Sequence, residues 1–566
     1  MTAPIITFKD FSFQYDSQTE PTLRHLNLAI YPGEKVLIAG PSGSGKSTLG
    51  RCLNGLIPQS FKGKLSGEAS VNGQAVQTTS IFERSLAVGT VLQDPDSQFV
   101  GLSVVEDMAF SLENDQQSQP QMQAATAKWA QTLHLQALLD QRPQALSGGQ
   151  KQRVAMAGVL IDNSKILLFD EPLASLDPAA GKASMALIEQ LTHTEALTVV
   201  IIEHRIEAVL EQPIDRLVIM SDGQIVANDR PEVILKTALL AQLGLREPLY
   251  LAALKLAGID LHAVSHVADL QQLTVPNLTA TLQHWTAGVA LKSPVPHLDS
   301  LLNIDQLSFG YDPRKPIIDQ LSLTLHRGEM VSLVGQNGTG KSTLSNLITG
   351  FLTPQAGHLT FDGHDLLTQS VKERADKIGY ILQDPNQMLS KTLIFDEVAT
   401  GLVLRGVATA TIKKRVLATL KVCGLYEFRH WPISALSFGQ KKRVTIAAIL
   451  VLEPTMLILD EPTAGQDLKH YTEMMTFLTT LNQQQHLTIM LITHDMHLML
   501  EYTDRTLVLG HGKIIKDAAP ADVLTDTAII KTAGLAKTSL YTLAAQHQLN
   551  PTEFVAKFVQ AEREAR

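Results

Sequence analysis

A glycine-rich octapeptide occurs twice in the chain and constrains its fold more than any other feature. Gly40–Ser47 reads GPSGSGKS and Gly335–Ser342 reads GQNGTGKS, so both copies satisfy the pattern GxxxxGK[ST]. Each copy follows an apolar run, Val36–Ala39 or Val331–Val334, and this context predicts a strand that leads into a phosphate-binding loop. The lysine of such a loop reaches the terminal phosphates, and the serine hydroxyl binds Mg²⁺. We therefore expect the chain to bind two nucleotides.

The repeat extends well beyond these loops. LSGGQ at Leu146–Gln150 is followed 290 residues later by LSFGQ at Leu436–Gln440. The same spacing relates Gln93, Asp170, Glu171 and His204 to Gln383, Asp460, Glu461 and His494. A period this long indicates a duplicated domain of about 280 residues, which is large enough for a core of its own. We predict a first domain over residues 1–264, a linker over 265–300 and a second domain over 301–566.

Composition excludes several classes of function. The chain has 566 residues and a formal net charge of −9, which argues against a nucleic-acid partner. Its two cysteines, Cys52 and Cys423, form no CxxC pair, so a disulfide framework or an iron–sulfur cluster is not expected. The longest apolar region, Ile446–Leu459, is interrupted by Glu453 and Pro454 and is too short to span a bilayer. The N-terminus lacks the pattern of a secretion signal, so we expect any membrane role to be peripheral.

Strand and helix patterns alternate within each half. Ile166–Phe169 and Thr198–Ile202 are unbroken apolar runs, as are their counterparts Met456–Leu459 and Thr488–Ile492. Such runs are typical of strands buried on both faces of a parallel sheet. All of them end in polar residues, which places the chemistry at the carboxyl edge of the sheet. Residues 116–141 and 409–430 are predicted to form helices of an inserted lobe.

The ordered set of motifs resembles the ABC ATPase superfamily. The phosphate loop, the glutamine, LSGGQ, the Asp-Glu pair after an apolar strand and the histidine all occur in this order, twice. The resemblance covers nearly the whole chain. It implies an α/β fold of two tandem P-loop nucleotide-binding domains, each with a RecA-like parallel-sheet core, an antiparallel β lobe and a helical lobe. It also implies an ATPase that uses ATP and Mg²⁺, and no guanine-reading NKxD motif is present.

The resemblance assigns roles residue by residue. Residues with catalytic roles would be Glu171 and Glu461 as general bases, with His204, His494, Gln93 and Gln383. The Mg²⁺ ligands would be Ser47, Gln93, Asp170, Ser342, Gln383 and Asp460. The nucleotide would be bound by Tyr15, Gly40, Pro41, Ser42, Gly43, Ser44, Gly45, Lys46, Ser47, Thr48, Ser147, Gly149, Gln150, Tyr311, Gly335, Gln336, Asn337, Gly338, Thr339, Gly340, Lys341, Ser342, Thr343, Ser437, Gly439 and Gln440.

Two of these assignments leave room for other interpretations. Tyr15 and Tyr311 would stack on adenine, but Phe13 and Phe309 lie two residues earlier, so all four could be core aromatics of a strand. In the family, LSGGQ of one half faces the nucleotide of the other, so the chain would act as a pseudo-dimer. Phe438 replaces the first glycine of that motif in the second copy. Because phenylalanine avoids positive φ and adds bulk, we expect the two ATP sites to be unequal.

Within the superfamily, the chain is most similar to the fused ATP-binding component of energy-coupling-factor importers. The cues are Gln93-Asp94-Pro95 and Gln383-Asp384-Pro385 after predicted strands, and Ala464–Asp467. This resemblance implies uptake of a vitamin, of the thiamine-precursor kind, or of a transition-metal ion such as cobalt or nickel. It also implies a peripheral position on the cytoplasmic face of the cell membrane. The partners would be an integral-membrane scaffold subunit and a separate substrate-binding membrane subunit, without nucleic acid.

Three other classes of ABC protein are alternatives. A tandem sugar-importer ATPase usually has one eroded site, whereas both halves here keep the lysine and the glutamate. A ribosome-associated tandem ABC ATPase would need a long, highly charged linker. An ATP-driven DNA-repair or chromosome protein would need zinc cysteines or long coiled coils. The transported substrate itself cannot be derived from this chain, because a separate subunit recognises it in the family.

Overall fold

The chain forms two compact units, which are described separately. The computed structural model describes residues 3–174, 176–291, 299–312, 314–464 and 466–565. Unit 1 comprises residues 1–282 and unit 2 comprises residues 283–566. The predicted linker, residues 265–300, contains this boundary, an isolated β-bridge between Ser265 and Thr274, and helix α12 (Leu278–Gly288). Residues 292–298 of that prediction lie outside the described residues.

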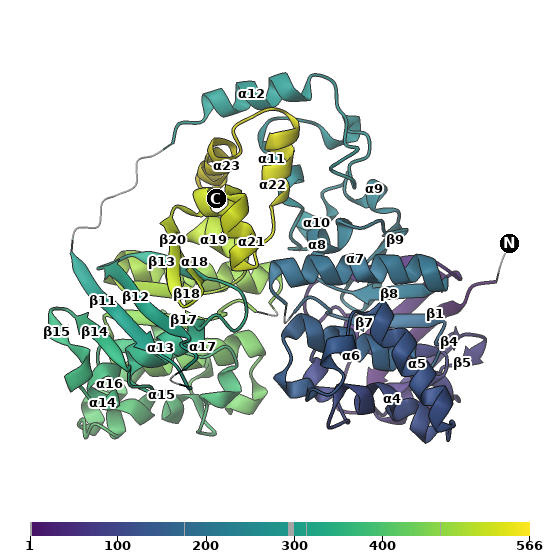
Figure 1. Cartoon of the computed structure of the whole chain (residues 1–566), viewed down its shortest axis with the longest axis horizontal. Helices are drawn as coiled ribbons and strands as arrows, with labels where there is room; N and C mark the ends of the chain where they lie inside the picture. Colours follow the sequence, from purple (N-terminus) through teal and green to yellow (C-terminus); the bar gives the residue numbers. More distant parts are fainter. Residues whose placement is uncertain (1–2, 175, 292–298, 313, 465, 566) are drawn as a thin grey trace. The chain divides into compact units, whose positions relative to one another are not determined.

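The core of unit 1 is a six-stranded sheet in the order β10-β9-β3-β8-β7-β6 (Figure 1). Its strands are β3 (Lys35–Ala39), β6 (Val88–Val91), β7 (Ile166–Asp170), β8 (Thr198–Ile202), β9 (Arg216–Ser221) and β10 (Gln224–Asp229). All neighbours pair in parallel except β9 and β10, which are antiparallel. Every residue of β3 and β8 is buried, as expected for strands covered on both faces. The predicted parallel sheet is confirmed.

An antiparallel sheet and a helical lobe complete unit 1. The sheet has the order β2-β1-β4-β5 and consists of β1 (Ile6–Tyr15), β2 (Leu23–Ile30), β4 (Gly63–Val71) and β5 (Gln74–Ala75). One apolar cluster joins Phe8 and Phe11 of this sheet to Ile38 of the parallel sheet. The helices of unit 1 are α1 (Lys46–Leu53), α2 (Leu56–Gln59), α3 (Ile81–Ser85), α4 (Val104–Asn114), α5 (Gln119–Thr132), α6 (Gly148–Leu160), α7 (Pro178–Glu195), α8 (Ile206–Leu210), α9 (Pro231–Ile234), α10 (Leu239–Gln242) and α11 (Leu249–Leu256), with 3₁₀ turns η1 (Pro95–Ser97), η2 (Gln136–Leu138), η3 (Pro143–Ala145) and η4 (Leu261–Ala263).

Unit 2 repeats this architecture with the same strand order. Its parallel sheet runs β16-β17-β18-β13-β19-β20 and its antiparallel sheet β12-β11-β14-β15. The strands are β11 (Ser300–Phe309), β12 (Ile318–His326), β13 (Met330–Val334), β14 (Ala356–Phe361), β15 (His364–Asp365), β16 (Ile378–Ile381), β17 (Met456–Asp460), β18 (Thr488–Ile492), β19 (Arg505–Gly510) and β20 (Lys513–Ala518). The predicted tandem α/β nucleotide-binding fold is therefore confirmed in both halves.

The helices of unit 2 follow the same order along the chain. They are α13 (Lys341–Thr349), α14 (Val371–Ala375), α15 (Ile394–Val403), α16 (Thr409–Val422), α17 (Phe438–Leu450), α18 (Leu468–Gln485), α19 (Met496–Tyr502), α20 (Pro520–Thr525), α21 (Thr527–Ala533), α22 (Ser539–Gln546) and α23 (Pro551–Ala565), with 3₁₀ turns η5 (Leu366–Thr368), η6 (Pro385–Gln387), η7 (Tyr426–Phe428) and η8 (Ile433–Ala435). The predicted helical segments 116–141 and 409–430 contain α5 with η2, and α16 with η7. Each segment is broken where a residue turns to positive φ, at His134 and Gly424. No described helix is both long and apolar enough to cross a membrane.

The last helix of unit 2 packs on the part of α12 that belongs to the same unit. The rings of Trp285 and Phe554 meet edge to face with centroids 5.6 Å apart. The Lys557 Nζ donates a hydrogen bond of 2.7 Å to the carbonyl of Thr286. These contacts join the first and the last helical residues of unit 2.

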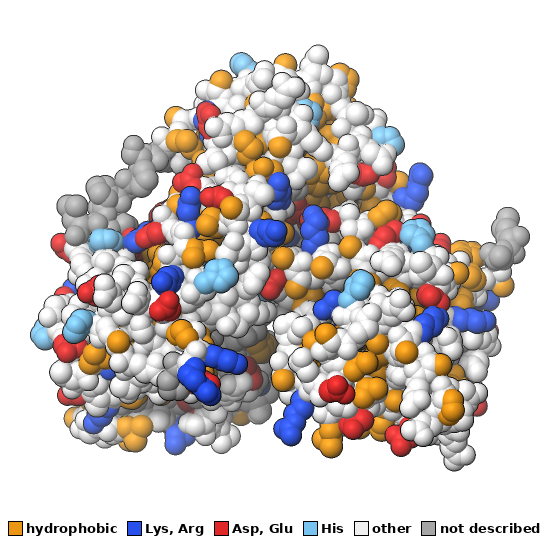
Figure 2. Space-filling view, viewed as in Figure 1, with side chains coloured by type: hydrophobic (Ala, Val, Ile, Leu, Met, Phe, Trp, Pro, Cys, Tyr) orange, Lys and Arg blue, Asp and Glu red, His pale blue; other side chains and the backbone are white. Residues whose placement is uncertain are grey.

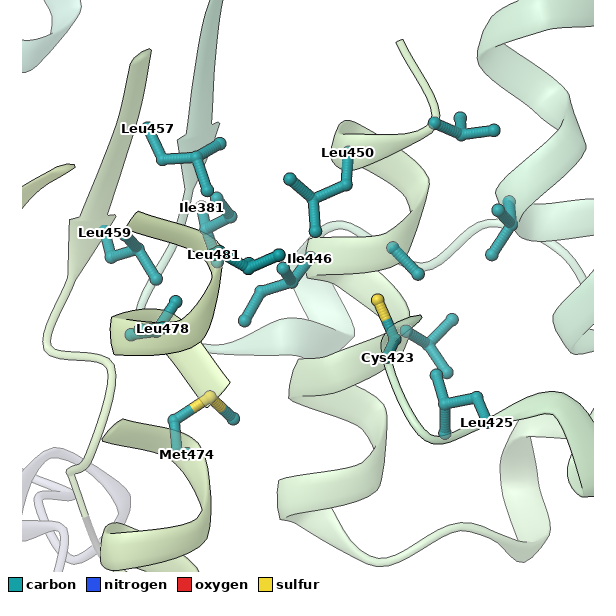
Figure 3. Close-up of a cluster of buried hydrophobic side chains, with 14 of the residues drawn as sticks. Ile381, Cys423, Leu425, Ile446, Leu450, Leu457, Leu459, Met474, Leu478 and Leu481 are labelled. Carbon is teal, nitrogen blue, oxygen red and sulfur yellow. The ribbon is translucent and has the colours of Figure 1, made fainter. Parts of the chain in front are cut away.

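A large apolar cluster holds the helical lobe of unit 2 to its parallel sheet (Figure 3). Leu478 of α18, Leu459 of β17 and Ile446 of α17 all belong to it and are fully buried. The strand, the core helix and the lobe helix thus share one hydrophobic contact surface. This contact fixes the start of α17 relative to the end of β17.

We predict that Leu478→Ala destabilises unit 2 by about 2–5 kcal/mol, because it removes buried methyl groups and leaves a cavity. In calorimetry of the full chain, one unfolding transition should move down by several degrees. Leu404→Ala makes the same chemical change at a side chain that is 74% exposed, and serves as the control. Equal shifts from the two variants would contradict the importance of this cluster.

Candidate functional site

The phosphate loop of each unit is folded around its own lysine. In unit 1 the loop joins β3 to α1, and the Lys46 Nζ donates to the carbonyls of Gly40 at 2.7 Å and Pro41 at 2.9 Å. Lys341 makes the two equivalent bonds in unit 2, with the same lengths. Both lysine side chains are buried. The ammonium group therefore holds the loop in a curved form.

The first glycine of each loop is required by a close approach to a neighbouring strand. A Cβ atom at Gly40 would lie 2.2 Å from the carbonyl oxygen of Met220 in β9. At Gly335 it would lie 2.3 Å from the carbonyl oxygen of Leu509 in β19. Real Cβ atoms are not found this close to backbone, so any side chain here would displace the loop.

The acidic pair lies where the central strands end. Asp170 is the last residue of β7, and Glu171 follows with a φ of 50°. Its N–H donates to the carbonyl of Ile202, the last residue of β8, at 2.8 Å. Glu461 has a φ of 43° and makes the equivalent bond to Ile492 at 2.9 Å. Left-handed backbone is unusual for glutamate and is held here by the surrounding ladder.

Burial perturbs the carboxyl groups at this edge. Desolvation raises the pKa of Asp170, while the charges of Arg51 and Lys46 oppose the rise. Desolvation also raises the pKa of Glu171, with His204 opposing and Glu203 adding to the rise. The pKa of Asp460 is raised for the same reason. Perturbed carboxyl groups beside a lysine-lined loop are typical of catalytic sites.

The oxygen donors at this edge fit Mg²⁺. The Ser342 hydroxyl donates to a carboxylate oxygen of Asp460 at 3.3 Å, so the two predicted metal ligands lie together. One hydroxyl and one carboxylate suit a cation that takes its remaining ligands from water and phosphate. In the described part of the chain there is no cluster of three or more His, Cys, Asp or Glu side chains that could hold a metal alone.

The predicted glutamine and histidine of unit 1 both approach the glutamate. The Gln93 amide donates to a Glu171 carboxylate oxygen at 2.7 Å. The His204 Nδ1 lies 3.8 Å from the other Glu171 oxygen and 3.3 Å from a carboxylate oxygen of Glu203. In unit 2 the His494 Nδ1 lies 2.7 Å from the Glu461 carboxylate, an ion-pair contact without hydrogen-bond alignment. In unit 1 the predicted glutamine, glutamate and histidine are thus brought together, and in unit 2 the histidine and the glutamate are.

The predicted adenine-stacking tyrosines differ between the units. The Tyr15 hydroxyl lies 3.2 Å from the Thr48 hydroxyl and accepts a 3.0 Å hydrogen bond from Arg51. Tyr311 is 66% exposed. Phe13 and Phe309 are buried and each meets its tyrosine edge to face. The phenylalanines are therefore core residues, and the tyrosines stand at the margin of the core.

The two LSGGQ-like motifs begin α6 and α17. Ser147 and Ser437 are the N-cap residues, and each donates its N–H to the side chain of the glutamine three residues later, at 2.9 and 3.0 Å. Phe438 is the first residue of α17, and neither it nor Gly148 has a positive φ. The expected backbone conflict at Phe438 is therefore wrong, because the first position of a helix has helical φ. Its ring is 44% exposed, so only the argument from its bulk remains.

Two buried charged residues beside the site were missed by sequence reasoning. Glu203 is fully buried in unit 1, where its carboxylate accepts N–H bonds from Leu173, His204 and Arg205 at 2.8–3.2 Å. Lys442 is 1% exposed in unit 2, and burial lowers its pKa to about 8. The internal repeat could have revealed both, since their counterparts at the spacing of 290 are the uncharged Thr493 and Gln152.

Comparison with known proteins identifies the family. A model described as "ABC transporter" matches residues 23–174 and 318–464. The chain belongs to the ABC transporter family. It is accordingly an ATPase, and its predicted resemblance to ABC ATPases is confirmed. A second model, described as "ATP-binding cassette cobalt transporter", matches residues 237–309.

Relatives of this ABC protein extend over its full length. A protein of Lactiplantibacillus plantarum, named as an ABC transporter ATP-binding protein, is 77% identical over 100% of both chains. Proteins with the same name from Enterococcus faecalis and Streptococcus mutans are 56% and 52% identical, over 100% and 97% of both chains. Among solved structures, cbiO1 from Clostridium perfringens, part of the ABC transporter complex cbiONQ, is 33% identical over 41% of this chain and 94% of that chain, with a TM-score of 0.39.

We predict that Gly335→Ala weakens binding of MgATP at the second loop by at least about tenfold, because the loop must move away from β19. Isothermal titration of the full chain would measure this loss. Gly363→Ala provides the control, since Gly363 also has a positive φ of 75° but no atom lies within 4 Å of the added Cβ. Unchanged ATP affinity in Gly335→Ala would show that the loop tolerates a side chain.

Proposed function

We propose that this ABC ATPase is the motor subunit of an energy-coupling-factor importer. The observation that carries the proposal is the match of residues 237–309 to the cobalt-transporter ATP-binding model, in a chain that carries two complete ABC halves. Two halves in one chain would supply the ATPase pair of such an importer. An integral-membrane scaffold and a separate substrate-binding subunit would be its partners at the cytoplasmic face of the membrane.

The substrate would be a transition-metal ion or a vitamin of the thiamine-precursor kind. The family description names cobalt, which favours the metal ion over the vitamin. Uptake of labelled cobalt, nickel and thiamine precursors by cells with and without this gene would decide between them. Loss of uptake for one class alone would identify the substrate, and unchanged uptake of all three would argue against the importer.

The residues at the sheet edge account for hydrolysis in each half. The loop N–H groups and Lys46 or Lys341 would hold the phosphates, and Asp170 or Asp460 would hold the metal with the loop serine. Mg²⁺, when bound, neutralises charge on the phosphates. Glu171 or Glu461 would accept a proton from the attacking water. The neighbouring glutamine and histidine would orient that glutamate and the water.

An apolar surface next to the first glutamine loop suits a membrane partner. Leu102 is 81% exposed, Val100 is 61% exposed, and Phe110 of α4 is 40% exposed. Figure 2 shows hydrophobic side chains on the face that carries α4 and α5. Single exposed apolar residues are ordinary, but several of them together mark a surface that can bind a partner. Because this surface lies beside the loop that contacts Glu171, a partner bound here would be close to the proposed catalytic site. We propose that a short partner helix docks here.

The runner-up functions fit less well. A sugar-importer ATPase with one eroded site would not keep Lys46, Lys341, Glu171 and Glu461 in matched positions. A ribosome-associated ATPase would need a long charged linker helix, whereas α12 has 11 residues and none of them is Asp, Glu, Lys or Arg.

The double substitution Glu171→Gln with Glu461→Gln should abolish ATP turnover while ATP binding is retained. It keeps shape and hydrogen bonding but removes the proton acceptor, and loss of a general base typically costs about 10²-fold or more. Phosphate release and ATP titration measure the two quantities. Retention of more than about a tenth of the wild-type turnover would be incompatible with the assigned role.

Leu102→Asp should reduce co-purification of the chain with its membrane subunits, because it places a charge in the apolar docking surface. Turnover by the isolated chain should be unchanged. Val233→Asp, at a 42% exposed apolar position on α9, is the matched control. If both variants co-purify like the wild type, the membrane partner docks elsewhere.

A further inference from the structure

The two halves differ in charge at two buried positions around otherwise matching sites. On the helix that begins with the LSGGQ-like motif, unit 1 has Gln152 and unit 2 has Lys442. Directly after the strand that precedes the histidine, unit 1 has Glu203 and unit 2 has Thr493. Unit 1 thus carries a buried acid where unit 2 carries a hydroxyl, and unit 2 carries a buried base where unit 1 carries an amide.

In unit 2 the buried ammonium joins the glutamine loop to the glutamate segment. The Lys442 Nζ donates to the backbone carbonyl of Gln383 at 2.7 Å and to that of Glu461 at 3.2 Å. With its own position on α17, Lys442 therefore connects three parts of the site. Hydrogen bonds from a charged donor in a buried place are strong, and losing the donor would leave two carbonyl groups unsatisfied.

In unit 1 the buried groups make a different connection. The Gln152 amide donates to the carbonyl of Pro172 at 3.0 Å, next to Glu171, and no bond from it to the glutamine loop is found among the described residues. Instead, Glu203 binds the N–H groups of Leu173, His204 and Arg205. The glutamate segment of unit 1 is thus joined to the histidine segment by a buried carboxylate, whereas in unit 2 the Thr493 hydroxyl donates to the Glu461 carboxylate at 3.4 Å. The glutamine loop of unit 1 is bonded to Glu171 through the Gln93 side chain.

We propose that Lys442 is a positioning residue that couples the glutamine loop of the second half to its catalytic glutamate. A displacement of the loop at Gln383 moves Glu461 through the shared ammonium. In the first half no bond from Gln152 to the glutamine loop is described, and the loop contacts its glutamate through the Gln93 side chain instead. This inference rests on the proposed roles of the glutamine and the glutamate. It predicts that hydrolysis in the second half depends on Lys442 through the glutamine loop, whereas hydrolysis in the first half does not depend on Gln152 in this way.

The test is a double-mutant cycle in the full chain. Glu171→Gln is used as background, so that turnover comes from the second half. Lys442→Gln introduces the residue that the first half carries at this position, and should lower kcat about tenfold while the KM for ATP stays within about twofold. Combining it with Gln383→Ala should cost little more than the larger single change, because the bond from Lys442 to the backbone carbonyl of Gln383 is what positions the Gln383 side chain.

The first half offers the matched control. In a Glu461→Gln background, Gln152→Leu and Gln93→Ala should multiply in their effects on kcat, since no bond joins Gln152 to the glutamine loop. Multiplicative effects in both halves would overturn the proposal. So would a rise in KM with kcat unchanged in Lys442→Gln.

A further variant separates positioning from packing. Lys442→Arg keeps the positive charge and the donors, and should retain more of the wild-type kcat than Lys442→Gln. Equal losses from arginine and glutamine, accompanied by equal falls in melting temperature, would assign Lys442 a purely structural role and overturn the proposal. The assay requires only ATP hydrolysis, so a negative transport experiment would count against the importer and leave this test intact.

Discussion

The parallel pairing of two buried strands determines the rest of each half. β7 pairs with β8 so that Asp170 is level with Ile202, and β17 pairs with β18 so that Asp460 is level with Ile492. The ladder continues for one further bond into each glutamate. Because both strands are apolar and buried, a shift of register would move charged groups into the core. This edge of the sheet is therefore fixed by hydrophobic burial rather than by its own polar contacts.

Most of this edge could be predicted from the sequence. Two matched phosphate loops and two apolar runs that end in Asp-Glu predict parallel strands with polar residues at their carboxyl ends, and the constant spacing pairs the equivalent residues of the two halves. The role of Tyr15 is harder to predict, since the sequence does not show whether Tyr15 or Phe13 packs in the core. The motif does not predict the helical φ of Phe438, because the start of the helix is set by Ser437 as N-cap and not by the glycine of the motif.

Lys442 and Glu203 show which part of the site the motifs alone do not predict. A lysine two residues after the Gly-Gln of the motif is expected from its sequence context to be a solvated side chain on a helix surface. Only the packed structure shows that Lys442 is 1% exposed and that its ammonium group donates to two backbone carbonyls. The duplicated halves thus share one strand order but differ in the hydrogen-bond partners of their buried polar groups. Each site therefore has its own hydrogen-bond network on a common backbone.

The contact between α12 and α23 has a consequence for synthesis of the protein. Lys557 and Thr286 are 271 residues apart in the chain, yet they are hydrogen-bonded within unit 2. The first helical turn of this unit therefore cannot make its contact with α23 until that helix has been synthesised. Closing so long a loop is entropically unfavourable until the sheet between them has formed. The first half can complete its sheets before the second half is made, whereas unit 2 makes this contact only once helix α23 has been synthesised.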